Sequence, residues 1–338
     1  MKLSDLGEFG LIERFSGQFL KDLQPGVIGI GDDAAVIPQD EENSLLVTTD
    51  MLIEDTHFLR SAIPPADLGH KALAVNLSDI AGMGGKPAYV FLSLGLPPDL
   101  DVAWVDQFFA GLRALAEQHA VRLLGGDTTK SLAGIVVNIT ALGTIANRHI
   151  KLRSAARPGD LVCVTGNLGD SGAGLRLLLE QKPRDADAEI LISRHHRPAP
   201  HVREGQSLGA RTDVHAMMDV SDGIDSDLKR IIEKSGCGMD IDLGRLPLSD
   251  ELKRVCRMHQ WDASELAVAG GEDYCLLLTI PPAEFATLAA DFSKAFHRPL
   301  AAIGEVTANA GVLRYLAQGT PRHFDNRGWD HFKAGKKP

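Results

Sequence analysis

Aspartates recur along this chain where apolar segments end. The stretch LLVTTDMLIEDTHF, residues 45–58, runs from an apolar segment into two threonines and an aspartate, and similar junctions occur in VIGIGDDAAVIP, AVNLSDIAGMGG, RLLGGDTT and AMMDVSDGI. The aspartates at these junctions are Asp32, Asp33, Asp50, Asp79, Asp127, Asp219 and Asp222. Any one of them alone is best explained as a turn former or a helix N-cap.

Taken together, these acids indicate a binding site for divalent cations. Carboxylates that converge repel one another and are costly to keep ionised without a counter-charge. Mg²⁺ binds a few carboxylates and completes its shell with water and phosphate oxygens. The pattern therefore predicts a nucleotide-phosphate site in which metal ions, rather than lysines, supply the positive charge. Thr48 and Thr49 add oxygen ligands beside Asp50, whereas Asp225 and Asp227 are sufficiently explained as acids in a first helical turn.

Other nucleotide and metal signatures are absent or weak. The chain has no GxxxxGK[ST] P-loop, and the match of GIGDDA to a dinucleotide motif fails because Asp32 and Asp33 would repel a pyrophosphate. GNLGDSGAGLRLLL, residues 166–179, is either an anion site at a helix N-terminus or a tight turn into a packed helix. The histidines of RHHRPAPHVREGQ are expected on a solvated or interface helix, namely His195, His196 and His201.

Bulk composition excludes several classes of function. The 338 residues carry a formal charge of −10 and show no Lys/Arg stripe, so we expect no nucleic-acid partner. The four cysteines are far apart and predict neither disulfides nor a zinc site. No stretch approaches the roughly 18 apolar residues of a membrane span, and the N-terminus does not resemble an export signal. We therefore expect a soluble cytoplasmic protein without a membrane partner.

Strand-like and helix-like segments alternate, which predicts an α/β or α+β fold. One helix is expected in residues 101–121, with a buried stripe, and another in residues 67–85, with Asp67 as N-cap and glycines 82, 84 and 85 as its end. The stripe consists of Val102, Val105, Phe109, Leu112, Leu115 and Ala116. Asn76 and Asp79 should share a face of the second helix. Residues 88–96 and 134–145 predict strands.

The pattern breaks at Pro158-Gly159 and restarts with a new strand. We therefore place a domain boundary near residue 150, which gives an N-terminal α/β domain over 1–150 and a C-terminal α/β domain over 151–338. In the second domain, SDGIDSDLKRIIEKSGCG predicts a helix that ends at Gly236.

Seven motifs, in this order and spacing, carry a resemblance to a known family. They are GIGDDAAV, TTDMLIEDTHF, KALAVNLSDIAGMGGKP, LLGGDTT, DVSDGI, GGEDY and NRGWDHF. Together they resemble the thiamine-monophosphate kinase family over nearly the whole chain. The resemblance implies a two-domain fold of the aminoimidazole-ribonucleotide-synthetase type, whose N-terminal domain pairs with a second copy in a homodimer. It also implies the reaction, which converts ATP and thiamine phosphate into ADP and thiamine diphosphate.

The resemblance also assigns roles to individual residues. It implies that several Mg²⁺ ions and ATP are bound mainly by the N-terminal domain, and that the C-terminal tail contacts the thiamine moiety. The implied metal ligands are Asp33, Thr48, Thr49, Asp50, Asp79, Asp127, Asp219 and Asp222. The implied ATP contacts are Gly126, Asp127, Arg153 and Ser221, and the implied substrate contacts are His57, Glu272 and Trp329. Trp329 stands where tyrosine is expected as readily, and Thr48 where serine is common.

The implied chemistry needs no catalytic base. The attacking oxygen belongs to a phosphate monoester whose second pKa is about 6, so it is mostly ionised at neutral pH. Two other readings remain open: another ATP-dependent enzyme of the superfamily, of the cyclo-ligase type, or a magnesium-nucleotide sensor without turnover. A selenophosphate synthetase would need a reactive Cys near its N-terminus, but the first cysteine here is Cys163.

Overall fold

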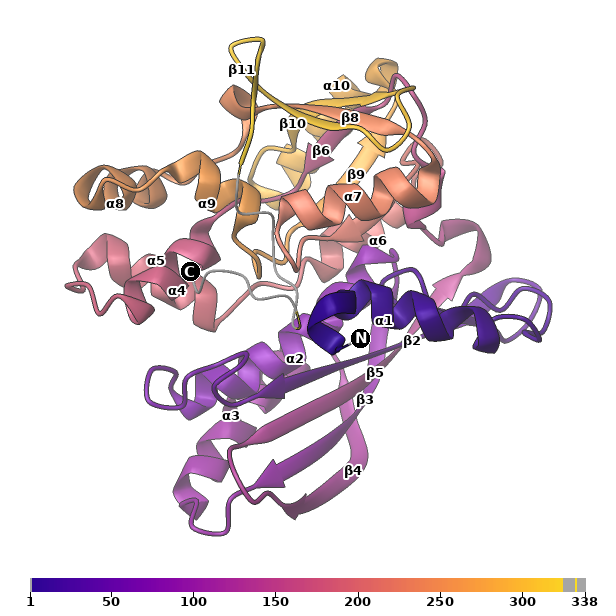
Figure 1. Ribbon diagram of the computed structural model, residues 1–338. Coiled ribbons are helices and arrows are strands. Elements are labelled where there is room, and N and C mark those ends of the chain that lie inside the picture. The colour runs from indigo at the N-terminus through magenta and orange to yellow at the C-terminus, as the bar shows by residue number, and fades with distance from the viewer. Residues whose placement is uncertain (1, 325–331, 333–338) are drawn as a thin grey trace.

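The computed structural model describes residues 2–324 and residue 332, and it is built around two β-sheets (Figure 1). The first sheet has five strands and the second has seven, with helices packed on both. This arrangement confirms the expected mixture of helices and sheets. In the described part of the chain, none of the helices combines the length and apolar character needed to cross a membrane.

The N-terminal sheet has the strand order β1-β2-β5-β3-β4. Its strands are antiparallel except for β3 and β4, which run parallel at one edge. The strands are β1 (Ala35–Pro38), β2 (Asn43–Ile53), β3 (Lys86–Leu96), β4 (Arg122–Lys130) and β5 (Val136–Ala146). The accompanying helices are α1 (Leu3–Phe19), α2 (Pro65–Gly82) and α3 (Val102–Gln118), with the 3₁₀ turn η1 (Asn147–His149). The predicted strands at 88–96 and 134–145 correspond to β3 and β5.

One face of this sheet is covered and the other is not. Along β2, the residues Ser44, Leu46, Thr48 and Leu52 are buried, whereas Met51 on the opposite face is half exposed. This alternation follows from the two-residue period of a strand. The covered face packs on α2, and edge strand β4 is exposed along its whole length.

Helices α2 and α3 approach closely through glycines. A Cβ on Gly69 would lie 1.9 Å from the carbonyl oxygen of Phe108, and one on Gly111 would lie 1.8 Å from that of Ala66. Two details of the sequence prediction were wrong. Helix α2 starts at Pro65, so Asp67 lies in its first turn and is not the N-cap. On α3, Phe108 is buried, while Val102 and Phe109 are exposed, because the glycine contact sets which face turns inward.

The C-terminal sheet has the strand order β12-β11-β8-β10-β6-β9-β7. Its strands are β6 (Leu161–Val164), β7 (Met217–Asp219), β8 (Gly238–Asp242), β9 (Leu276–Ile280), β10 (Ala301–Thr307), β11 (Leu313–Ala317) and β12 (Thr320–Arg322). Its helices are α4 (Asp170–Leu179), α5 (Ala186–His196), α6 (Val202–Gly209), α7 (Ile224–Ser235), α8 (Asp250–His259), α9 (Ala263–Ala269) and α10 (Pro282–Phe296). The 3₁₀ turns are η2 (Arg153–Ala155) and η3 (Leu243–Arg245). Helix α7 ends at Gly236 in the left-handed conformation, as predicted.

The histidines of residues 194–206 are buried, so of the two predicted alternatives, a solvated or an interface helix, the solvated one was wrong. His195, His196 and His201 are 4%, 5% and 7% exposed. Helices α5 and α6 both pack against α2, which turns these side chains inward. Burial lowers the pKa of His196 to about 4 and that of His201 to about 3, so both rings are neutral at pH 7.

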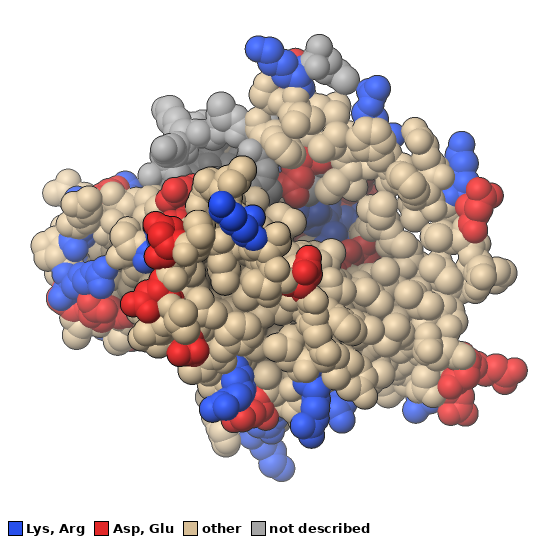
Figure 2. All heavy atoms as spheres, turned by 90° about the horizontal axis from the view of Figure 1, so that it is seen from below, with Lys and Arg blue, Asp and Glu red and all other residues tan. Residues whose placement is uncertain are grey.

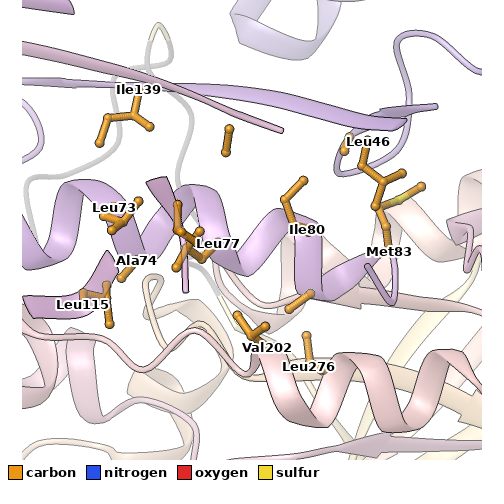
Figure 3. Close-up of a cluster of buried hydrophobic side chains, with 14 of the residues drawn as sticks. Leu46, Leu73, Ala74, Leu77, Ile80, Met83, Leu115, Ile139, Val202 and Leu276 are labelled. Carbon is orange, nitrogen blue, oxygen red and sulfur yellow. The ribbon is translucent and has the colours of Figure 1, made fainter. Parts of the chain in front are cut away.

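Helix α2 lies between the two sheets and belongs to a core that both share. Figure 3 shows Leu73, Leu77 and Ile80 of α2 between residues of the N-terminal sheet and Val202 and Leu276 of the second half. On the C-terminal side, Gly205 of α6 lies against the carbonyl of Ala81, where a Cβ would approach to 2.3 Å. The two halves are therefore in direct apolar contact along α2.

The glycine contact between α2 and α3 predicts a large effect of one methyl group. Gly69→Ala places its Cβ against the Phe108 carbonyl, and relief of that overlap should destabilise the protein by about 1–3 kcal/mol. Gly17→Ala in α1 is the matched control, because a Cβ there meets no atom within 4 Å and alanine favours helix by about 1 kcal/mol. Urea unfolding of both variants checks this, and equal stability of the two would contradict the packing described for α2 and α3.

Candidate active site

Three aspartates from separate elements meet at the junction of the two halves. Asp33 precedes β1, Asp79 lies on α2 and Asp219 ends β7. Each contributes one carboxylate oxygen to a group in which these oxygens all lie within 4.8 Å of one another. Asp33 and Asp219 are buried, and Asp79 is half-buried. Three of the aspartates that the sequence places beside apolar segments therefore converge, although they are 186 residues apart at the extremes (219 − 33).

Helix α2 places Asp79 and its neighbours against β2. The hydroxyl of Thr48 donates to Asp79 Oδ2 over 2.5 Å, and the backbone N–H of Asp50 donates to Asn76 Oδ1 over 3.2 Å. Asn76 and Asp79 thus share a helix face, as their spacing predicts. From the other side of α2, the hydroxyl of Ser78 donates to Asp219 Oδ2 over 2.6 Å.

The end of α2 has no side chain where Asp33 lies. A Cβ on Gly82 would lie 2.1 Å from Asp33 Oδ2 and 2.9 Å from the backbone nitrogen of Asp219. Only a glycine allows the loop before β1 and the end of β7 to approach the helix this closely. The sequence predicts Gly82 only as the end of the helix. In the structure, its missing side chain also makes room for Asp33 and for the end of β7.

The cluster has less positive charge around it than its carboxylates require. Burial raises the pKa of Asp33 above its usual value and those of Asp79 and Asp219 well above it, and the neighbouring carboxylates add to the rise for each. Burial raises the pKa of Asp50 to about 6, with further contributions from Asp222 and Asp33. The site thus favours either protons or an added cation.

Two arginines give partial compensation at the edges of the cluster. The guanidinium of Arg153 pairs with Asp33, and its backbone N–H donates to Asp32 Oδ1 over 2.8 Å. Arg230 pairs with Asp222 over 2.5 Å. Beside them, Asp227 of α7 is fully buried, and neither of its carboxylate oxygens has a hydrogen-bond partner in the described part of the chain. Burial raises its pKa well above the usual value, so this first-turn acid belongs electrostatically to the cluster.

Thr49 and Asp127 lie on the other face of the N-terminal sheet. The register pairs Met51 with Asn138, Asn138 with Ser93, and Ser93 with Asp127, so these residues form one row. Thr49 also points to that face, where its hydroxyl donates to the Ile139 carbonyl over 3.1 Å. The structure therefore divides the predicted metal ligands, with Thr49 and Asp127 separated from Asp33, Thr48, Asp50, Asp79, Asp219 and Asp222.

The remaining predicted contacts come from separate elements. Gly126 is in edge strand β4 with φ of 151°, and its Cβ position would overlap the Leu92 carbonyl at 1.7 Å. Ser221 follows β7, and its carbonyl accepts from the backbone N–H of Glu272 over 2.7 Å. His57 lies in the turn after β2, where Nδ1 accepts from the Ile53 N–H over 3.0 Å. Trp329 lies outside the described residues.

The sequence did not predict that a carboxyl group of the same protein would occupy the glycine-rich turn. The carboxylate of Asp273 accepts from the backbone N–H groups of Gly169 and Ser171, over 2.6 and 3.2 Å, at the start of α4. The free N–H groups of residues 166–174 therefore bind a side chain of the same protein, from the GGEDY motif. Lys71, buried in α2 and paired with Glu272, was also missed. The one available signal was a lysine within the apolar run HKALAV.

Comparisons with known proteins agree with this geometry. Residues 31–145 match the family model of AIR synthase related protein, N-terminal domain, and residues 157–315 match that of the C-terminal domain. These matches confirm the expected fold type.

The relatives are similar over almost their full length. The thiamine-monophosphate kinase of Escherichia coli (strain K12) is 41% identical over 328 residues, which are 96% of this chain and 98% of that protein. That of Haemophilus influenzae is 39% identical over 335 residues, covering 98% and 99%. The solved structure of AaThiL complexed with AMPPCP and TMP superposes with a TM-score of 0.86 at 35% identity and covers 98% of this chain and 99% of its own. The chain therefore belongs to the thiamine-monophosphate kinase family.

Proposed function

We propose that this protein transfers the γ-phosphoryl group of ATP to thiamine phosphate, by direct in-line transfer, and so forms thiamine diphosphate. The observation that carries the proposal is the buried acid cluster at the junction of the two halves, in a chain of this family. The complex of AaThiL with AMPPCP and TMP supports both substrates. The direct test is incubation with ATP, Mg²⁺ and thiamine phosphate, followed by chromatography. Release of ADP without formation of thiamine diphosphate would favour another ATP-dependent reaction. The absence of ADP release would favour a nucleotide sensor.

The residues present fit Mg²⁺. Asp33, Asp79 and Asp219 offer hard oxygen ligands close enough to share an ion. Burial and the neighbouring carboxylates raise the pKa of each, which an added cation would offset. Asp50 and Asp222 lie close enough to add to the negative electrostatic potential of this cluster. When bound, divalent ions would neutralise the phosphate groups of the two substrates and keep them in line. We propose these acids and Thr48 as ligands, with Thr49 and Asp127 as further ligands on the opposite face of the sheet.

The chain's own groups position the substrates and do not remove a proton. The acceptor phosphate is largely ionised at neutral pH, so no general base is required. Arg153 is held through its backbone by Asp32 and through its guanidinium by Asp33, and we propose that it contacts ATP. We assign Gly126, Asp127 and Ser221 to ATP as well, and His57, Glu272 and Trp329 to the thiamine moiety.

We further propose that residues 1–150 and 151–338 act as the two domains, and that the protein works in the cytoplasm. All four cysteines are buried and unpaired, which suits a reducing compartment. ATP as co-substrate is consistent with the same location.

A homodimer through the open face of the N-terminal sheet is the proposed assembly. That face and edge strand β4 expose large apolar side chains, including Met51 at 50%, Tyr89 at 45%, Phe91 at 40% and Leu124 at 56%. Seen from below, toward the N-terminal half, a broad area to the right of and below the centre shows no Lys, Arg, Asp or Glu side chains (Figure 2). The exposed apolar side chains on this face support an interface there.

The dimer predicts that a charge on this face separates the subunits. Phe91→Lys would bury an unpaired ammonium in the interface, so the protein should sediment as a monomer at micromolar concentration. Leu132→Lys is the control: Leu132 lies in the loop after β4 and is 94% exposed. Sedimentation velocity distinguishes the two, and a dimeric Phe91→Lys variant would place the interface elsewhere.

The role of Asp50 can be tested with little change in shape. Asp50→Asn removes a charge from the cluster and should lower kcat at least roughly hundredfold, by analogy with the loss of one transition-state stabiliser. Excess chelator should stop turnover of the unaltered protein without unfolding it. Steady-state assays and circular dichroism measure both effects. A near-normal kcat for Asp50→Asn would remove that residue from the site.

Stability without metal should fall as pH rises. The folded-state pKa of Asp50 is about 6, above its ordinary value of 3.8, so the folded protein holds this proton more tightly than the unfolded chain does. The stabilisation that comes from this tighter proton binding is complete below about pH 4 and is lost as the pH rises through about 6. The pKa values of Asp79 and Asp219 are raised further, so their contributions are lost at higher pH. In chelator, the Tm should drop by at least about 2–4 °C from pH 5.5 to 8, and Mg²⁺ should restore it.

The variant Asp219→Asn separates this effect from general pH sensitivity. It removes one repelling charge, and its side-chain oxygen still accepts from Ser78, so the metal-free Tm at pH 8 should rise while the response to Mg²⁺ shrinks. Asp106→Asn on the exposed surface of α3 should change neither. A metal-free Tm for Asp219→Asn below that of the unaltered protein would contradict the account of charge repulsion.

A further inference from the structure

Lys71 is a fully buried lysine that crosses the junction between the two halves. It lies in the middle of α2 and is 0% exposed. Its Nζ lies 2.9 Å from Oε2 of Glu272, in the loop between α9 and β9, and no other hydrogen bond of this ammonium occurs in the described part of the chain. A buried ion pair of this kind adds little stability, since apolar residues of similar volume are often as stable. Stability alone therefore does not explain why Lys71 and Glu272 are paired at this buried position.

The loop that carries Glu272 is held in a strained conformation. Glu272 has φ of 65° and Tyr274 has φ of 49°, a region that side-chain-bearing residues seldom adopt. The backbone N–H of Tyr274 donates to the Val220 carbonyl over 2.9 Å, and that of Glu272 donates to Ser221. The next residue, Asp273, is fixed by the start of α4. Such strain persists where surrounding contacts over-determine the backbone, which is typical of functional sites.

The contacts to the Glu272 carboxylate all reach the same oxygen. His195 Nδ1 lies 3.2 Å from Oε2 and 3.0 Å from the hydroxyl of Ser171. Burial lowers the pKa of His195 well below its usual value, and the Lys71 ammonium adds to this, so the ring is neutral. Oε1 of Glu272 accepts no hydrogen bond from any residue that the structure describes, and the side chain is 24% exposed.

We propose that Lys71 is a positioning residue for the acceptor substrate: by binding Oε2 it orients Glu272 so that Oε1 faces the thiamine moiety. Thiamine has an aminopyrimidine whose N–H groups can donate to a fixed carboxylate oxygen, and a cationic thiazolium that the same carboxylate attracts. Lys71 itself contacts neither substrate and acts through Glu272. The inference rests on the proposed function, because it assigns Glu272 to thiamine phosphate.

Lys71→Met tests this with a side chain of similar length and no charge. Glu272 then loses its fixed partner, so KM for thiamine phosphate should rise about tenfold or more, while KM for ATP stays within about twofold. The Tm should also fall, since Glu272 is left in a largely buried position without its ion-pair partner, so the difference between the two KM values carries the test. Equal changes in both KM values would show a general structural role and overturn the proposal.

Lys151→Met is the matched control. Lys151 is also buried, but its Nζ donates to the backbone carbonyls of Arg211 and Val214, over 2.6 and 2.8 Å. Its loss leaves these acceptors unpaired, so the Tm should fall without a selective change in KM for thiamine phosphate. A selective KM effect in this variant would show that the assay does not isolate the contact with Glu272.

A double-mutant cycle with Glu272→Gln identifies the route of the effect. If Lys71 acts only through the Glu272 carboxylate, Lys71→Met should have little further effect on KM in the Glu272→Gln background. Additive effects of the two changes would contradict the proposal. The unaltered protein is assayed first: failure to form thiamine diphosphate would reject the proposed function, whereas turnover with an unchanged KM in Lys71→Met would reject this inference alone.

Discussion

The mutual repulsion of buried carboxylates is the constraint on which the rest of this structure depends. Asp33, Asp79 and Asp219 lie close enough to share one cation, and all three are held in place by neutral hydrogen-bond donors or by a single arginine. Such an arrangement is costly to fold without added positive charge. In the proposed reaction, the cations that stabilise these acids would also reduce the repulsion between the two phosphate-bearing substrates.

Helix α2 is the element that makes this arrangement possible. It contributes Asp79 to the cluster, supports β2 through Asn76, binds Asp219 through Ser78 and pairs Lys71 with Glu272. Its apolar faces are enclosed by both halves, so nearly every residue from Leu68 to Gly82 is buried. A rigid, buried helix positions side chains more accurately than a surface loop does. One helix therefore positions both the proposed metal ligands and Glu272, the proposed substrate contact.

Much of the fold and part of the site could be predicted from the sequence. Local signals were sufficient for β3, β5 and the end of α7 at Gly236, and the recurrence of aspartates beside apolar segments indicated the cluster. The face of the sheet or helix to which each side chain points was harder to predict. Two-residue alternation separates Thr48 from Thr49, yet only the pairing of strands shows that Thr49 and Asp127 share the uncovered face. The inward turn of His195 and His196, and the capping of α4 by Asp273, depend on contacts between segments about 100 residues apart in sequence or more, which local patterns do not report.

The measurement that tests the central claim most directly is a titration of the nucleotide-free protein with Mn²⁺, followed by electron paramagnetic resonance. Mn²⁺ takes the oxygen ligands that suit Mg²⁺. The account predicts saturable binding at pH 8 that Mg²⁺ displaces and that weakens as the solution is brought to pH 5.5, where protons compete for the same carboxylates. The absence of saturable binding, or binding that Mg²⁺ and protons leave unchanged, would contradict the assignment of these buried acids to a metal site.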